Sequence, residues 1–117
     1  MRQVAVQPDK SDPKPLTEPV LLILMSLASK PRHGYALMRD IEDLSNGRVR
    51  LSTGTLYGAL RRLLADHWIE RFGQKDTSRD KQAYKLMPAG RKQLEIELDR
   101  MKQLTRAGTL RLRAREA

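Results

Sequence analysis

The chain contains no cysteine, which excludes disulfide bonds, thiolate metal sites and catalysis by cysteine, and is typical of a reducing compartment. Aromatic residues are scarce, with one tryptophan, one phenylalanine and three tyrosines among 117 residues. The longest apolar run, 20–25, is far shorter than the roughly 20 residues that cross a bilayer. It follows a proline-bearing segment of mixed charge without a small-residue cleavage site, so we expect no signal peptide. These absences predict a soluble, cytoplasmic protein that does not enter a membrane.

Acidic residues are outnumbered by basic ones, 14 against 23, which gives a formal net charge of +9 and a pI near 10.4. Such a charge is the electrostatic signature expected of a nucleic-acid-binding domain. A basic solvated surface and a membrane-surface protein are the alternatives, and charge alone does not choose between them. The length is that of one small domain.

Apolar spacing predicts four helices and one hairpin. The expected elements are helices at 17–29, at 33–44, from 52 to about 67 and from 88 to at least 104, with strands at 68–72 and 82–87. Three short helices followed by a hairpin is the order of a winged helix-turn-helix. The predicted fold class is therefore mainly α (α+β), a winged helix-turn-helix of three helices and a two-stranded wing, followed by a C-terminal helix.

Local signals predict the ends and faces of the first two helices. Thr17 is expected as the N-cap of the first, and Asn46-Gly47 as a left-handed close of the second. The first helix is apolar on nearly every side, so it is either central or part of an interface. In the second helix, the expected inward residues are Leu37, Ile41 and Leu44, and the expected outward residues are Arg39, Asp40, Glu42 and Asp43.

The most informative segment is Arg48–Arg62, in which Ser52 is the expected N-cap of the third helix. At about 100° per residue, one face of this helix carries Leu56, Leu60, Leu63 and Leu64, and the other carries Gly54, Thr55, Gly58, Arg61, Arg62 and Ala65. A glycine inside a helix costs roughly 1 kcal/mol relative to alanine. Two glycines on the exposed face therefore predict that a bulky anionic partner approaches the helix backbone, as a DNA groove does.

Two motifs, His33-Gly-Tyr35 and Gly54-Thr-Leu-Tyr57, occur together at a specific separation. With Leu-Thr-Glu at 16–18, Trp-Ile at 68–69 and Tyr-Lys-Leu at 84–86, they resemble the PadR family of winged-helix transcriptional regulators over roughly 16–98. The chain departs from the family pattern at His67, where glycine is frequent, and at Met87, where threonine is usual. The resemblance implies a homodimer that binds a palindromic operator in double-stranded DNA, usually as a repressor, with the third helix in the major groove and the wing on the flanking backbone.

The residues expected to contact DNA lie on the third helix, at two tyrosines and in the wing: Tyr35, Ser52, Thr53, Gly54, Thr55, Tyr57, Arg61, Arg62, Lys75, Arg79 and Lys81. Arg61 and Arg62 could bond guanine or phosphate, and the alternative is a solvated helix face. For Tyr35 and Tyr57, a structural role and a DNA role are both open and are compatible. The wing cations are expected to hold phosphates rather than to read bases.

A seam on the last helix predicts the dimer interface, because apolar residues recur there at four-then-three spacing. The expected interface residues are Leu94, Leu98 and Met101, together with Leu21, Leu22 and Met25 of the first helix. The next seam positions, Thr105 and Gly108, predict that the seam fades there. An interface that binds a small hydrophobic effector and one that holds no ligand are both open. The expected domains are a flexible arm at 1–15, a winged-helix DNA-binding domain at 16–88 and a C-terminal dimerisation helix with a basic tail at 89–117.

No enzyme, metal site or cofactor is predicted. His33 and His67 have no ligand-spaced partners, and no nucleophile with an adjacent base can be assigned. Trp68 is expected to fill the space between the wing and the third helix rather than to stack on a ligand.

A winged-helix protein–protein module is the rival function, but its docking face should carry exposed apolar anchors rather than glycine, threonine and arginine. A membrane-surface protein is the third possibility, and the sequence lacks the aromatic anchors that it needs.

Overall fold

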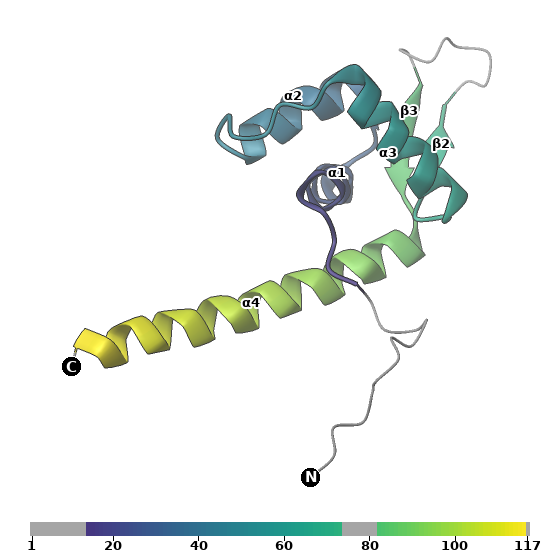
Figure 1. Cartoon of the computed structure of the whole chain (residues 1–117). Helices are drawn as coiled ribbons and strands as arrows, with labels where there is room; N and C mark the ends of the chain where they lie inside the picture. The colour runs from purple at the N-terminus through teal and green to yellow at the C-terminus, as the bar shows by residue number, and fades with distance from the viewer. Residues whose placement is uncertain (1–13, 74–81, 117) are drawn as a thin grey trace, which may run out of the picture.

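The computed structural model describes residues 14–73 and 82–116 (Figure 1). The elements in chain order are α1 (Glu18–Ser29), β1 (Arg32–His33), α2 (Gly34–Leu44), α3 (Thr53–Ala65), β2 (Ile69–Phe72), β3 (Ala83–Leu86) and α4 (Pro88–Glu116). This order confirms the predicted winged helix-turn-helix, with a long C-terminal helix. The predicted wing tip, including Lys75, Arg79 and Lys81, lies outside the described residues, as does most of the predicted arm.

Helix α1 is the centre of the fold. In Figure 1 it is seen nearly end-on, between α2 and α4, and it also contacts α3 and β3. Its N-cap is Thr17, as predicted, whose side chain accepts a hydrogen bond from the Val20 N–H. Four consecutive side chains, at 21–24, are buried, which requires neighbours on every side of the helix. Of the two predicted alternatives, central or interfacial, the structure places α1 in the core of the single chain.

Helix α2 begins one residue later than predicted and differs from the prediction at two side chains. Leu37 and Ile41 are buried as expected, but Leu44 is exposed, because the chain turns away immediately after it. That turn has Asn46 and Gly47 at positive φ, as predicted, and the Gly47 N–H donates to the Glu42 carbonyl. The prediction that Asp40 points outward is wrong.

Asp40 belongs to a polar cluster that joins α1, β1 and α2. The buried Ser26 hydroxyl donates to Asp40 Oδ2 at 2.6 Å. Arg32 Nε donates to the Ser26 carbonyl at 3.1 Å, and Arg32 Nη2 lies 3.5 Å from the same Asp40 oxygen. A buried hydroxyl and a half-buried carboxylate are each satisfied in this way, which removes the cost of burying them unpaired. The cluster fixes α2 relative to α1.

The sheet has three strands in the order β1-β3-β2, one more than predicted. Strand β2 pairs antiparallel with β3 from Ile69↔Leu86 to Phe72↔Ala83, which is the predicted hairpin. Strand β1 pairs with the other edge of β3 through Arg32↔Tyr84 and His33↔Ala83. A strand of two residues has no periodicity to detect, and its pairing partner lies about fifty positions away, so local sequence could not reveal it.

Helix α3 ends at Ala65, two residues earlier than predicted, in a left-handed turn centred on His67. The φ angle of His67 is 61°. The Trp68 N–H donates to the Leu63 carbonyl and the His67 N–H to the Leu64 carbonyl, which together form a Schellman motif. This conformation is strained for a residue with a Cβ, which gives a physical reason for glycine being frequent at this position.

We expect His67→Gly to raise the free energy of unfolding by about 1 kcal/mol, because glycine adopts the left-handed conformation without steric cost. Urea denaturation monitored by circular dichroism measures the change. Asn46 occupies the same position in the turn after α2, with φ 54°. Because asparagine tolerates this region, the control Asn46→Gly should gain only a few tenths of a kcal/mol. A loss of stability in His67→Gly would show that the imidazole makes a contact that outweighs the strain.

Helix α4 begins at Pro88, although Met87 replaces the usual capping threonine. The Met87 N–H donates to the Trp68 carbonyl at 2.9 Å, and the Met87 carbonyl accepts from the Arg91 N–H. Further along, Glu97 is buried and accepts from the Leu16 N–H and from both Nε and Nη2 of Arg100. The bonded Arg100 guanidinium lowers the pKa of the Glu97 carboxyl below its ordinary value. These contacts tie the chain that enters α1 to the first third of α4.

Candidate nucleic-acid interface

The N-terminus of α3 is capped by Ser52, as predicted. The Ser52 hydroxyl accepts from the Thr55 N–H at 3.1 Å and donates to Thr55 Oγ1 at 2.9 Å. The Ser52 hydroxyl therefore both donates and accepts a hydrogen bond within the chain, and the Thr55 hydroxyl accepts one. Thr53, next to Ser52, is exposed and lines a pocket.

The two faces of α3 separate as the sequence predicts. Leu56, Leu60 and Leu63 are buried in the core, and Leu64 is half-buried. On the other face, Gly54, Thr55, Arg61 and Arg62 are exposed and Gly58 is half-buried. Neither arginine forms an ion pair with any residue in the described ranges. Both guanidinium groups are thus available to an anionic partner.

The glycines on this face have no packing role within the described chain. A Cβ added to Gly54 or to Gly58 would have nothing within 4 Å, and neither residue has a left-handed φ. Packing and backbone conformation therefore give no reason for glycine at either position, while helix propensity favours alanine by roughly 1 kcal/mol at each.

The two tyrosines proposed for DNA contact differ sharply in exposure. Tyr57 is only 7% exposed and belongs to the core, whereas Tyr35, on the first turn of α2, is 69% exposed. The Tyr57 hydroxyl lies against Gly34, where any Cβ would collide with it. The His-Gly-Tyr and Gly-Thr-Leu-Tyr motifs are therefore in direct contact, which explains why they occur together. Tyr57 has little surface to offer DNA, and Tyr35 has ample surface.

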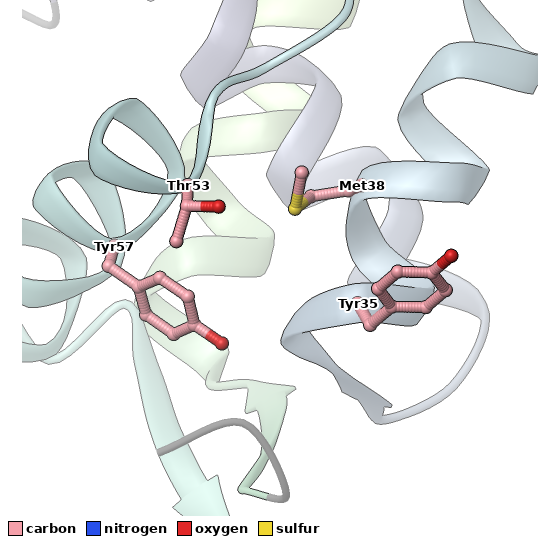
Figure 2. A pocket seen from close by; sticks show the side chains of 4 residues that line it. All are labelled: Tyr35, Met38, Thr53 and Tyr57. Carbon is pink, nitrogen blue, oxygen red and sulfur yellow. The ribbon is translucent and has the colours of Figure 1, made fainter.

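A pocket of about 260 Å³ opens between the starts of α2 and α3, lined by Tyr35, Met38, Thr53 and Tyr57 (Figure 2). Figure 2 shows Thr53 and Tyr57 on one side and Met38 and Tyr35 on the other. Met38 was not among the predicted site residues, although its position one turn after Tyr35 places both on one side of α2. The pocket lies between the two helices of the helix-turn-helix, at the end of α3 that carries Gly54.

The described stem of the wing is cross-linked by polar contacts. Arg71 Nε donates to Gln82 Oε1 at 2.7 Å, and Lys85 Nζ lies 3.1 Å from Glu70 Oε1. The same Lys85 nitrogen lies 5.5 Å from the centre of the exposed Phe72 ring, within cation–π range. These contacts hold the two strands in register up to the point where the wing tip begins.

The structure divides the predicted dimer residues into two groups. Leu21, Leu22 and Leu94 are buried in the core of the single chain, so they have little surface left for a partner. Met25 is half-buried, and Leu98 and Met101 are 42% and 38% exposed. Spacing showed which face of each helix is apolar, but it could not show whether that face meets the same chain or a second one. Of the predicted interface residues, Met25, Leu98 and Met101 are the ones that keep surface for a partner.

Helix α4 extends well past the body of the fold (Figure 1). Every side chain from 98 to 115 is exposed, except that of the half-buried Ala107. The exposed large apolar residues of this helix are Leu98, Met101, Leu104, Leu110 and Leu112. Leu112 continues the four-then-three spacing beyond Thr105 and Gly108, so the apolar seam resumes where it was expected to end.

Two further findings bear on other classes of function. Within residues 14–73 and 82–116, no three His, Asp or Glu side chains cluster so that they could hold a metal ion. Over the same residues, no helix combines the length and the hydrophobicity that a membrane span requires.

A helix-turn-helix followed by a β2–β3 wing, with β1 as the third strand of the sheet and a glycine- and arginine-bearing face on the second helix, defines a winged helix-turn-helix regulator. Residues 23–96 match the transcriptional regulator PadR-like family. This chain belongs to the PadR-like family of transcriptional regulators, in agreement with the sequence motifs.

The chain is also similar to other proteins in sequence or in fold. An uncharacterised 37.1 kDa protein from a transposon of Streptomyces fradiae is 41% identical over 85 residues, which is 73% of this chain but only 23% of that protein. A PadR family transcription regulator from Clostridium difficile superposes with a TM-score of 0.67 at 22% identity, covering 82% of this chain and 99% of that one. A transcriptional regulator from Clostridium thermocellum gives 0.64 at 20% identity, with 77% and 88% coverage. The two structures show the shared fold.

Proposed function

We propose that the protein is a dimeric, sequence-specific DNA-binding regulator that acts as a repressor on a palindromic operator. Each protomer places α3 in a major groove, and Arg61 and Arg62 contact guanine edges or phosphates. Tyr35 and the wing contact the flanking backbone. The net charge of +9 supports this function through attraction to phosphate.

Gly54 and Gly58, on the α3 face that points away from the core, are the observation that carries the proposal. Gly54 and Gly58 destabilise the helix and fill no tight space within the described chain. A partner that approaches the helix backbone closely supplies the missing reason, because a Cβ at either position would stand between the helix and that partner. The major groove is just wide enough to admit a helix, so side-chain volume on the inserted face matters there.

The rival function, a protein-docking module, is disfavoured by the distribution of exposed apolar side chains. In the described part of the chain, the large exposed ones lie on α2, β2 and α4, and none lies on α3. Interfaces between proteins are usually centred on buried aromatic or aliphatic anchors, which this face of α3 lacks.

Dimerisation through α4 is part of the same proposal. The exposed Leu98, Met101 and Leu112 side chains lie on one side of α4, in the spacing that a pair of packed helices requires. A helical segment without packed neighbours is marginal in water, so a partner helix would stabilise it. Two protomers related by a two-fold axis would then present two α3 helices to half-sites about one turn, roughly 34 Å, apart.

Alanine at the two glycines tests the proposal. We expect Gly54→Ala and Gly58→Ala each to raise the free energy of unfolding by up to about 1 kcal/mol, and to weaken binding to operator fragments selected from genomic DNA by about 10-fold or more, as loss of one good base contact does. Chemical denaturation and fluorescence anisotropy measure the two effects on the same samples.

His67→Gly is the matched control, because it should stabilise α3 to a similar extent while removing rather than adding atoms. Its operator affinity should remain that of the unaltered protein. If both alanine variants gained stability and bound DNA as tightly as before, α3 would not approach DNA through this face and the proposal would be wrong.

A further inference from the structure

The loop between α2 and α3 carries two arginines that the proposed interface does not yet use, Arg48 and Arg50. This loop is anchored on both sides of Arg50. The Val49 N–H donates to Ser45 Oγ at 2.9 Å, and Val49 and Leu51 are both half-buried against the core. The backbone of Arg50 is therefore fixed between two packed apolar residues, while its side chain is 76% exposed.

Arg50 pairs with a carboxylate of α2. Its Nε atom lies 3.0 Å from Glu42 Oε1, and solvent reaches both side chains, with that of Glu42 42% exposed. An exposed pair of this kind adds little to stability, because solvent screens it and two long side chains must be ordered. Glu42 also stands in the last turn of α2, where a negative charge is unfavourable to the helix. The pair therefore contributes little to folding and can open at small cost.

The position of Arg50 relative to α3 is set by the chain itself. Only Leu51 separates it from the Ser52 cap, so the two Cα atoms are at most about 8 Å apart. The major groove is about 12 Å wide. When the start of α3 enters a groove, an arginine at this position lies at the groove's edge, where the phosphates are.

We propose that Arg50 is a ligand for a DNA phosphate, and that Glu42 holds it in the free protein and so lowers the affinity for DNA. The inference rests on the proposed function and adds to it a side chain of the same protein, Glu42, that competes with DNA for Arg50. DNA must exchange the Glu42 carboxylate for a phosphate oxygen on Arg50. The released carboxylate then stands close to the phosphate backbone, which repels it. Glu42 thus weakens binding twice, and it does so for every sequence, because a phosphate contact carries no base information.

Substitution of the carboxylate by an amide tests the inference without knowledge of the operator. The probe is a mixed-sequence 30-base-pair duplex, titrated by fluorescence anisotropy over a range of salt concentrations. We expect Glu42→Gln to bind about fivefold more tightly than the unaltered protein at low salt. We expect Arg50→Gln to bind more weakly, with a salt dependence shallower by about one unit of slope.

Asp43→Asn provides the matched control. Asp43 lies next to Glu42 in the same last turn of α2, it is exposed, and it forms no ion pair with any described residue. Its amide variant changes the net charge by the same amount without releasing Arg50, so its gain in affinity should be less than twofold. In an Arg50→Gln background, Glu42→Gln should gain no more than Asp43→Asn. Thermal unfolding of all variants should stay within about 2 °C of the unaltered protein, as expected for exposed charges.

Equal effects of Glu42→Gln and Asp43→Asn in the protein that retains Arg50 would overturn the inference and leave only a general effect of charge. The proposed function would survive that result, because the unaltered protein would still bind the duplex. If the unaltered protein bound neither this duplex nor any selected genomic fragment, the proposed function itself would fall, and the inference with it.

Discussion

Paired glutamates in place of Leu98 and Met101 are expected to convert the protein into a monomer. Both side chains are substantially exposed on α4 in the single chain, at 42% and 38%, so the substitutions should leave the fold of one protomer intact. In the proposed dimer they would lie in the seam between two helices, where each buried carboxylate would cost several kcal/mol. Four carboxylates close to the two-fold axis would also repel one another.

Sedimentation at micromolar concentration measures the expected change from twice the chain mass to a single chain mass. Affinity for a palindromic operator should fall by about 100-fold or more, because the two half-sites would no longer be bound by linked α3 helices. Leu110→Glu is the control. It adds a carboxylate to the same helix on the side nearly opposite the seam, and Leu110 is 59% exposed, more than Leu98 or Met101. An unaltered protein that sediments as a monomer would contradict the proposed assembly.

The second large effect concerns stability, and its sign should reverse between two glycines of the same helix. A Cβ at Gly90 would collide with the Trp68 carbonyl oxygen and lie 2.9 Å from Leu86 Cδ1. The Trp68 carbonyl cannot move freely, because it accepts the Met87 N–H at 2.9 Å where α4 begins. We expect Gly90→Ala to lower the free energy of unfolding by about 3 kcal/mol, the upper range for overpacking.

At Gly108 a Cβ would meet nothing within 4 Å in the described chain. Gly108→Ala should therefore raise the free energy of unfolding, by up to about 1 kcal/mol. Urea denaturation of both variants measures the difference between them. A Gly90→Ala variant as stable as the unaltered protein would show that the junction between the wing and α4 yields more easily than the structure indicates.

The parts of the fold that local sequence determines were predicted well. Capping by Thr17 and Ser52 and the left-handed turn at Asn46 each depend on residues within one helical turn, and each is confirmed. Strand β1 and the Ser26–Asp40 bond depend on residues that the fold brings together from a distance, so spacing gave no sign of them.

The candidate site shows the same division. The exposure of Gly54, Arg61 and Arg62 follows from helical periodicity and was predicted. The burial of Tyr57 was not, because Tyr57 lies at the edge of the apolar stripe of α3, where a small rotation of the helix decides the outcome. Leu21 and Leu94 were assigned to a partner for a related reason: the sequence specifies an apolar face without specifying which surface covers it.

The contact between Gly34 and the Tyr57 hydroxyl has a consequence for how this domain can vary. Positions 34 and 57 belong to different helices, but a Cβ at position 34 would collide with the Tyr57 hydroxyl. The two positions therefore cannot be substituted independently. A side chain at 34 becomes acceptable only after the residue at 57 has become smaller, so the order in which the two changes occur determines whether the intermediate folds. Variation at the two positions should therefore be correlated, and the effect of either substitution should depend in sign on the residue already present at the other.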